Sequence, residues 1–290
     1  MREVFFKYFF IAQNLFLLYN KNVSLNLLFL GGVKVKKRFL SAFMVLVMCF
    51  TLLPAKKIVT MADDNIVWIG KGTKKNPYKI KTAEDLKKLA ELVNAGNTYE
   101  NEYFKLMNDI DLCGDFLDPI GGISSRGFAE KGVPFNGVFD GDWHKISNFH
   151  IFEASNNDAG LFGWIGKNGI VKNLTVKDSK INGGFNVGGI AGLNYGIVTF
   201  CCNENTYVNG GNSGGIVGFN DYEGVVEYCD NTGTISGTET SGGIVGINNW
   251  FALVKYCNNF GYVLIDGDSK FGDEFDTKIG RNFGYYESWD

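Results

Sequence analysis

The sequence GGIAGLN at residues 188–194 recurs as GGIVGFN at residues 214–220 and as GGIVGIN at residues 242–248. A weaker copy, GLFG, stands at residues 160–163. Self-similarity at a nearly constant spacing indicates a repeat architecture, so these copies decide the fold. Two glycines recur at fixed positions in each copy and are predicted to lie at structural corners: Gly160, Gly163, Gly189, Gly192, Gly215, Gly218, Gly243 and Gly246.

A short segment typical of a β-strand follows each copy. These segments begin at Val171, Val198, Val226 and Val254, and we place Ile146 at the head of the same column. Successive members of this column lie 25, 27, 28 and 28 residues apart. A unit this short cannot bury a core by itself, so the units must stack as parallel strands. The pattern predicts an all-β solenoid, and it lacks the leucine ladder or helical period of other repeat folds.

Three cysteines, Cys201, Cys229 and Cys257, occupy one column of the repeat together with Leu174 and Phe149. Because the other residues of this column are apolar, its side chains are predicted to point into the core, where a thiol behaves as a small hydrophobic group. Cα atoms one rung apart also permit a disulfide, so reduced core thiols and a single bridge are both consistent with the spacing. The adjacent Cys202 is expected to face outward as the reactive thiol.

The repeats, together with FNGVFDGDWH at residues 135–144, resemble the GLUG-motif repeats of bacterial secreted and surface proteins. NPY at residues 76–78, TAEDL at 82–86 and YFKLMNDIDL at 103–112 also fit this resemblance, which covers about residues 68–265. It implies a right-handed parallel β-helix. Such helices occur in adhesins, in carbohydrate-related secreted proteins and beside the zinc peptidase domain of proteases that cleave immunoglobulin A.

The first 62 residues differ in charge from the rest of the chain. They hold 9 of the 28 Lys and Arg but only 1 of the 31 Asp and Glu, which leaves 19 − 30 = −11 for the remainder. Residues 35–62 have the basic start, apolar middle and small-residue end of a secretory signal peptide, with cleavage expected after Ala62. Residues 1–34 are interpreted as an upstream extension outside the translated protein. The chain is therefore expected to interact with a membrane only through its signal peptide.

Residues 63–134 are predicted to form a cap on the solenoid, residues 135–265 the repeats, and residues 266–290 a tail that ends a truncated chain. The cap is expected to contain one helix. Thr82 suits its start, and Gly96 suits its end. The helix would present one apolar face to the first rung: Leu86, Leu89, Ala90 and Val93.

The residues that catalysis or metal binding would need are scarce. His144 and His150 are the only histidines, and neither belongs to a His-Glu-x-x-His zinc motif or has the spacing of a catalytic triad. Asp140 and Asp142, with Asp109 and Asp111, are weak candidates for a cation site, but Asp-Gly more often marks a turn. We expect no enzyme activity, no cofactor and, given the acidic charge, no nucleic-acid partner.

Aromatic residues follow each Gly-Gly copy: Tyr195, Tyr222, Trp250 and Phe251. They are predicted to form a stripe on one edge. Two roles remain open: the rings are a stacking platform for a repeating glycan, or they cover the turns between strands.

These features predict a module of a secreted or cell-surface bacterial protein with an adhesive, ligand-binding or spacer role, whose partner is a glycan, a host surface or a cell-wall surface. A carbohydrate-active enzyme on the solenoid face is the first alternative. The second is the N-terminal fragment of a larger surface metalloprotease.

Overall fold

The computed structural model describes residues 68–122, 132–152 and 158–265, and also the backbone of five short strands elsewhere. Residues 1–64 and 65–290 form separate compact units. In the first unit, β1 (Leu28–Leu30) pairs antiparallel with β2 (Val33–Val35). Apart from these strands, the expected extension and signal peptide lie outside the described residues. Within the described residues, no helix has the length and apolar character that crossing a membrane requires.

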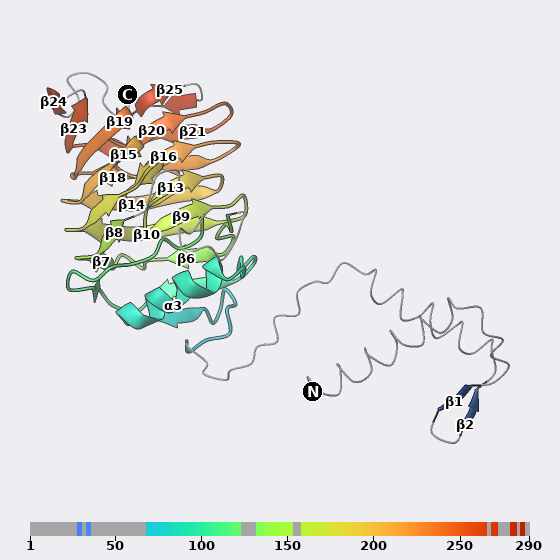
Figure 1. The fold of residues 1–290 in the computed structure, drawn as a ribbon. Coiled ribbons are helices and arrows are strands. Elements are labelled where there is room, and N and C mark those ends of the chain that lie inside the picture. Colours follow the sequence, from blue (N-terminus) through green and yellow to red (C-terminus); the bar gives the residue numbers. More distant parts are fainter. Residues whose placement is uncertain are drawn as a thin grey trace, which may run out of the picture. The chain divides into compact units, whose positions relative to one another are not determined.

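The second unit is a parallel β-solenoid of about six turns, which confirms the predicted fold class (Figure 1). The first sheet contains β3 (Tyr78–Ile80), β4 (Tyr103–Leu106), β5 (Ile110–Asp111), β6 (Val138–Asp140), β7 (Lys145–Ser147), β10 (Ile170–Lys177), β14 (Ile197–Glu204), β17 (Val225–Glu227), β18 (Asp230–Asn231), β21 (Leu253–Lys255), β22 (Asn258–Asn259) and β26 (Tyr285–Glu287). The second contains β8 (His150–Phe152), β11 (Lys180–Asn182), β12 (Asn186–Gly188), β15 (Tyr207–Gly214), β19 (Thr234–Gly242), β23 (Tyr262–Ile265) and β24 (Asp268–Phe271). The third contains β9 (Phe162–Ile165), β13 (Ala191–Asn194), β16 (Val217–Asn220), β20 (Val245–Asn248) and β25 (Ile279–Asn282).

The register confirms most of the predicted strand column but corrects its head. Val171 pairs with Val198, Val198 with Val226, and Val226 with Val254. The partner of Val171 on the preceding rung is Phe139, however, and Ile146 pairs with Val176. The prediction for Ile146 was wrong because the chain passes through a tight turn at residues 141–144 between Phe139 and Ile146, which adds residues to that rung.

The cysteine column lies in the core. Cys201 pairs with Leu174, as predicted, and all three column cysteines are buried and free rather than bridged. Phe149 is also buried, but it directly precedes β8 of the second sheet and its backbone carbonyl accepts from Lys180, so it does not belong to this column. Each column thiol instead approaches backbone carbonyls of its own and the preceding rung.

The repeated glycines allow parts of adjacent rungs to approach closely. A Cβ atom on Gly215 would lie 2.0 Å from the carbonyl oxygen of Gly243 and 2.4 Å from Cγ of Asn231. Gly189 and Gly243 have the same relation to Asn203 and Asn259. The glycine is therefore required by contact with a neighbouring asparagine side chain, a partner that lies 14–16 residues downstream.

Two ladders of buried asparagines run along the solenoid axis. In the first, Asn194 Nδ2 donates to Asn220 Oδ1 at 2.8 Å, and Asn220 Nδ2 donates to Asn248 Oδ1 at 2.9 Å. In the second, the same bond joins Asn203 to Asn231 and Asn231 to Asn259, each at 2.8 Å. Buried amides are stable only when they are hydrogen-bonded, so the ladders hold neighbouring rungs in register.

The helix α3 (Ala83–Asn94) lies across the first rungs, as the cap prediction required (Figure 1). Thr82 Oγ1 accepts from the backbone N–H of Asp85, whose carboxylate accepts in return from the backbone N–H of Thr82. This capping box satisfies two N–H groups at the helix start. The apolar face is buried, as expected: Leu86, Leu89, Ala90 and Val93.

Parallel pairing continues past residue 265. β25 pairs with β20, and β26 pairs with β21, so both strands extend existing sheets. Asn282 stands in register with Asn248 at the end of the first asparagine ladder. β24, in contrast, folds back antiparallel on β23.

Candidate functional site

The outer face of the first sheet carries an uninterrupted column of apolar residues. We call it the apolar stripe, and all its members are partly exposed: Tyr103, Val138, Ile170, Ile197, Val225 and Leu253. A strand with one solvated face normally places polar side chains at outward positions. Six successive rungs break that rule at the same position, so this column needs an explanation other than core packing.

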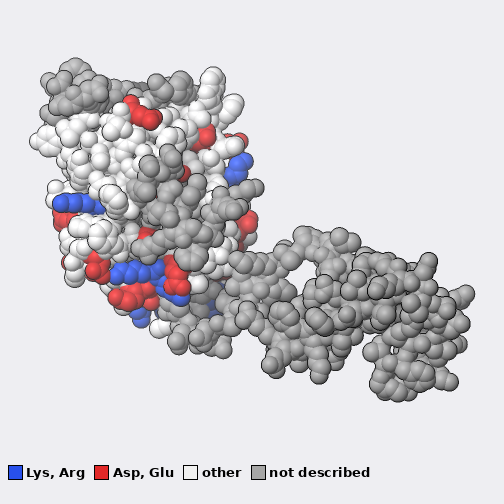
Figure 2. Space-filling model, in the orientation of Figure 1, with Lys and Arg blue, Asp and Glu red and all other residues white. Residues whose placement is uncertain are grey.

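The next outward column, two residues further along each strand, follows the rule. Its members are polar on every rung: Lys105, Asp140, Lys172, Thr199, Glu227 and Lys255. Their charges largely alternate in sign, and Lys172–Asp140 and Lys255–Glu227 are ion pairs of 3.0 and 3.2 Å. Stacking equal repeats would place like charges in contact, which this alternation avoids. In the view of Figure 2, charged side chains gather on the cap and the first rungs, whereas the described surface of the later rungs is largely uncharged.

The residues that precede the apolar stripe at the turn into each strand form a second relevant column, the corner column. On the first three rungs this turn carries an amide, and on the next three it carries an aromatic residue: Asn101, Asn136, Asn168, Tyr195, Tyr222 and Phe251. Tyr222 stands three residues before its stripe residue, where Glu223 takes the two-residue position, and the other five stand two residues before theirs. The aromatic half was predicted from the sequence, and the amide half was not. Each asparagine of the amide half stands two residues before a stripe residue, a spacing that becomes visible only once the stripe is known.

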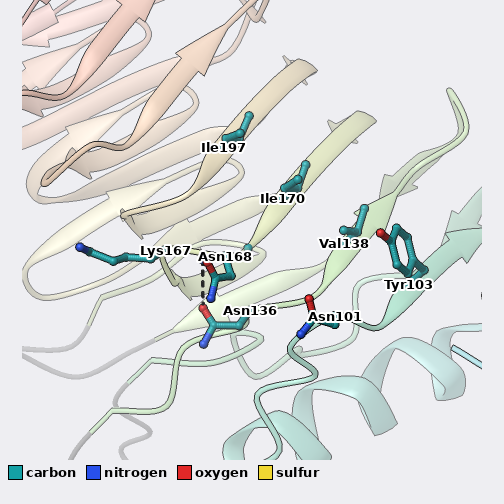
Figure 3. A pocket seen from close by; sticks show the side chains of 9 residues that line it. Asn101, Tyr103, Asn136, Val138, Lys167, Asn168, Ile170 and Ile197 are labelled. Atoms are coloured by element: carbon teal, nitrogen blue, oxygen red, sulfur yellow. Dashed lines mark hydrogen bonds between the residues drawn. The ribbon is translucent and has the colours of Figure 1, made fainter. Parts of the chain in front are cut away.

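A pocket of about 350 Å³ lies where the amide half meets the stripe. Figure 3 shows Val138, Ile170 and Ile197 side by side on successive strands. The pocket is also lined by Asn101, Tyr103, Asn136, Lys167 and Asn168. The backbone N–H of Asn168 donates to Asn136 Oδ1 at 3.4 Å, and Asn168 Nδ2 donates to Glu100 at 2.8 Å. These bonds hold the amide side chains of Asn136 and Asn168 at the edge of the pocket, beside the apolar stripe.

The predicted aromatic residues divide into a contact group and an isolated pair. The rings of Tyr195 and Tyr222 meet edge to face with centroids 4.5 Å apart, and Lys167 Nζ lies 5.5 Å from the centroid of Tyr222. Burial raises the pKa of Tyr195 to about 12, whereas Tyr222 is 52% exposed. Trp250 and Phe251 are 65% and 70% exposed, and within the described residues no ring contact joins either to Tyr222.

A second aromatic column was not anticipated. Phe200, Tyr228 and Tyr256 each precede a column cysteine, and their rings are stacked with centroids 4.8 and 5.1 Å apart. All three have left-handed backbones, with φ of 52°, 53° and 54°. Bulky residues rarely adopt this conformation, so the stack must contribute to holding it. Tyr228 lies between the other two rings, so both of its faces are covered within the stack.

The candidate cation ligands are engaged with protein groups instead of converging. Asp140 pairs with Lys172 and Asp142 with Lys105, at 3.0 and 2.9 Å. Asp109 accepts from the backbone N–H of Lys145 and from His144, and the backbone bond is the main cause of its lowered pKa. Asp111 accepts from the Cys113 N–H and the Asn148 amide. No cluster of three metal-binding side chains occurs among the described residues.

The remaining histidine and the reactive-thiol candidate also have specific environments. The ring of His150 packs edge to face on Phe116 at 5.8 Å. Cys202 is only partly exposed, and burial raises its pKa to about 11, which disfavours the reactive thiolate at neutral pH. Cys113 is exposed, in contrast.

No protein-family model matches the chain. A candidate Gly-rich membrane protein of Evansella cellulosilytica is 34% identical over 163 residues, which are 55% of this chain and 18% of that protein. Halomucin of Haloquadratum walsbyi is 29% identical over 161 residues, which are 52% of this chain and 2% of halomucin. The chain therefore spans less than a fifth of either curated relative.

A solved structure supports the fold. The crystal structure of a candidate immunoglobulin A1 protease from Bacteroides ovatus superposes with a TM-score of 0.52 and 24% sequence identity. The likeness covers 66% of this chain and 59% of that one. At this level of identity the likeness shows a shared β-solenoid and carries no conclusion about activity.

Proposed function

We propose that the chain is an extracellular, surface-exposed β-solenoid module with an adhesive, ligand-binding or spacer role and no catalytic activity of its own. The observation that carries this proposal is the apolar stripe beside the corner column. A surface that repeats over six rungs suits an extended partner, because each rung offers an equivalent contact.

The relatives support a surface location. One is named as a Gly-rich membrane protein and the other as halomucin, and the matched segment is a small part of each. We further infer that the repeats are of the GLUG type, since the Gly-Gly-Ile copies and their asparagine partners have one structural role on each rung. The expected signal peptide at residues 35–62 would bring the solenoid outside the cell.

Surface shaving tests the location. Intact cells that produce the protein are treated with a protease that does not enter them, and the released peptides are identified by mass spectrometry. We expect peptides from residues 65–265 in the released fraction and a mature N-terminus at Asp63. Recovery of the solenoid only after cell lysis contradicts the proposal, and peptides from residues 1–33 contradict the upstream extension.

A second assay tests the absence of catalysis. The full chain is incubated with immunoglobulin A1 and with soluble polysaccharides, followed by gel electrophoresis and a reducing-end assay. We expect neither new fragments nor new reducing ends. Cleavage of either substrate assigns an enzyme activity to this chain and refutes the non-catalytic role.

A further inference from the structure

We propose that the groove formed by the apolar stripe and the corner column binds a linear, neutral glycan that runs along the solenoid axis, with about one sugar unit per rung. This inference rests on the ligand-binding form of the proposed function and gives it a site and a ligand class. The floor of the groove is the stripe, and its wall is the corner column.

The floor favours a flat ligand that does not need backbone pairing. Each stripe residue lies on a strand that is paired to a strand on the preceding and the following rung. The face thus offers no free strand edge to which an extended peptide could add, so β-augmentation is excluded there. Sugar rings present flat C–H surfaces, which pack on aliphatic and aromatic side chains. Adjacent strands are about 4.8 Å apart, similar to the length of a sugar unit in an extended chain.

The amide half of the wall supplies hydrogen-bonding groups. Asn136 Oδ1 is engaged by Asn168, but Asn136 Nδ2 and the side chain of Asn101 have no partner among the described residues. An amide is both donor and acceptor, so it matches the hydroxyl groups of a sugar. The pocket of about 350 Å³ is large enough to hold part of such a chain against the stripe.

The aromatic half supplies stacking surface. Tyr195 and Tyr222 meet edge to face, and the side chain of Tyr222 remains 52% exposed. Lys167 lines the pocket and also lies over the Tyr222 ring, which makes the two halves of the wall continuous.

The charges beside the groove favour a neutral ligand. Lys167 is the cation in the pocket lining, and Glu100, Asp221 and Glu223 stand at the same corners. The chain after residue 62 carries a formal charge of −11 (19 − 30). An acidic protein repels anionic polymers over a range of about 8 Å at physiological salt.

Affinity electrophoresis of the full chain tests the site. Native gels contain hydroxyethylcellulose or galactomannan as neutral probes, and polygalacturonate as the anionic probe. We expect retardation by at least one neutral polymer and none by polygalacturonate. Asn101→Gly and Tyr222→Gly should each weaken retardation about three- to tenfold, since each removes one contact. Glycine suits both positions because their φ values are 64° and 54°.

Asn205→Gly is the matched control, since Asn205 is exposed, has φ of 50° and lies outside the groove. It should leave retardation unchanged. Melting temperatures of Asn101→Gly and Asn205→Gly should agree with the wild type within about 2 °C, as expected for exposed positions. Tyr222→Gly also loses its ring contact with Tyr195, so its melting temperature should fall by no more than about 6 °C. Unchanged retardation in both groove variants overturns this site but leaves a ligand-binding role in place.

The dependence of affinity on oligosaccharide length tests whether the glycan runs along the solenoid axis. Oligosaccharides of two to eight units from the retarding polymer are used as competitors. Affinity should keep rising beyond three units and level off near the six rungs between Tyr103 and Leu253. Levelling at two units overturns the axial direction, and no retardation by either neutral polymer overturns the inference. The surface-shaving experiment decides the proposed location independently of both outcomes.

Discussion

The asparagine ladders inside the solenoid and the corner column outside it are both built from one side chain per rung, but they differ in what their polar groups contact. In the ladders each amide donates to the next at 2.8–2.9 Å, and the residues are buried. In the corner column the residue type changes from amide to aromatic halfway along, and no hydrogen bond between two side chains of the column is found among the described residues.

This difference separates repetition that serves folding from repetition that leaves a surface available. Regular spacing alone does not distinguish them, since the stacked column at Phe200, Tyr228 and Tyr256 is as regular as either. The useful criterion is whether the repeated groups satisfy one another. Members of the ladders and of the stack contact one another through their side chains, whereas the bond between members of the amide half, among the described residues, is that from the Asn168 backbone N–H to Asn136 Oδ1 at 3.4 Å.

The largest expected effect is in the apolar core against which the ladders pack. Ile216 is fully buried, and Ile216→Asp would bury an unpaired charge, which costs several kcal/mol. Because rungs share one core, we expect several of them to unfold together. Thermal unfolding followed by circular dichroism measures the effect. Glu239→Asp, at an exposed position, is the control and should be nearly silent, and an unchanged melting temperature for Ile216→Asp would refute the register.

The next effect breaks a ladder itself. Asn220 Nδ2 donates to Asn248, and its Oδ1 accepts from Asn194. Asn220→Leu removes both ladder bonds from a buried site, so we expect a loss of about 2–4 kcal/mol in the free energy of unfolding by urea. Asn205→Gly, which removes an exposed amide and suits the φ of 50° at that position, should cost less than about 1 kcal/mol. Equal losses would mean that the ladder adds nothing beyond a single exposed amide.

Much of the solenoid could be predicted from the sequence, because the Gly-Gly copies and the column cysteines recur every 26–28 residues and a buried column tolerates few residue types. The second ladder could also have been found, since Asn203, Asn231 and Asn259 each stand two residues after a column cysteine. The register of Ile146 could not be predicted. It depends on the length of the turn that precedes Ile146, and the local sequence does not show how many residues that turn contains.

The candidate site was less predictable for a different reason. The aromatic half of the corner column was visible from ring type and spacing, but the amide half has no distinctive composition. Asparagine is common at turns for reasons of backbone geometry, and Asn101 indeed has φ of 64°. Only the strand pairing of Tyr103, Val138 and Ile170 shows that these turns open on one apolar column.

A third, shorter ladder ends in a carboxyl group and should respond to pH. Asn212 donates to Asn186, and Asn186 donates to Asp158, whose pKa is raised by burial to about 6. The folded state therefore holds its proton more tightly than the unfolded state. The stabilisation is complete below the unfolded pKa of 3.8 and is lost as pH rises through about 6.

Asp158→Asn removes this titration. We expect the variant to match the wild type near pH 3.5 and to be more stable at pH 7.5 by about 2–3 kcal/mol, at about 1.4 kcal/mol per pKa unit. Urea unfolding at several pH values gives the difference between the two proteins, in which the other carboxylates cancel. A difference that does not change with pH would show that Asp158 titrates normally.

A smaller effect tests the stacked aromatic column. At Tyr228 the φ of 53° favours glycine, so Tyr228→Gly should be more stable than Tyr228→Ala by about 1 kcal/mol, although both lose the stack. Tyr207 starts β15 with an ordinary backbone, and there the order should reverse, with glycine less stable than alanine by about 0.5–1 kcal/mol. Chemical denaturation of the four variants measures both differences. The same order at both positions would contradict the strained backbone.

The smallest effect on stability is expected at Trp250, the ring that decides between a platform and a roof over the turns. Trp250 is 65% exposed and the neighbouring Phe251 is 70% exposed, so truncation uncovers little that is now buried. Trp250→Ala should therefore change the free energy of unfolding by less than about 0.5 kcal/mol. A ring that covered the turn would leave a gap when truncated and cost about 3 kcal/mol or more. Retardation in neutral polysaccharide gels then has a clear meaning. If Trp250→Ala keeps its stability but is retarded less, the groove extends to the rung of Leu253. If the variant is retarded as strongly as the wild type, the groove ends at Tyr222.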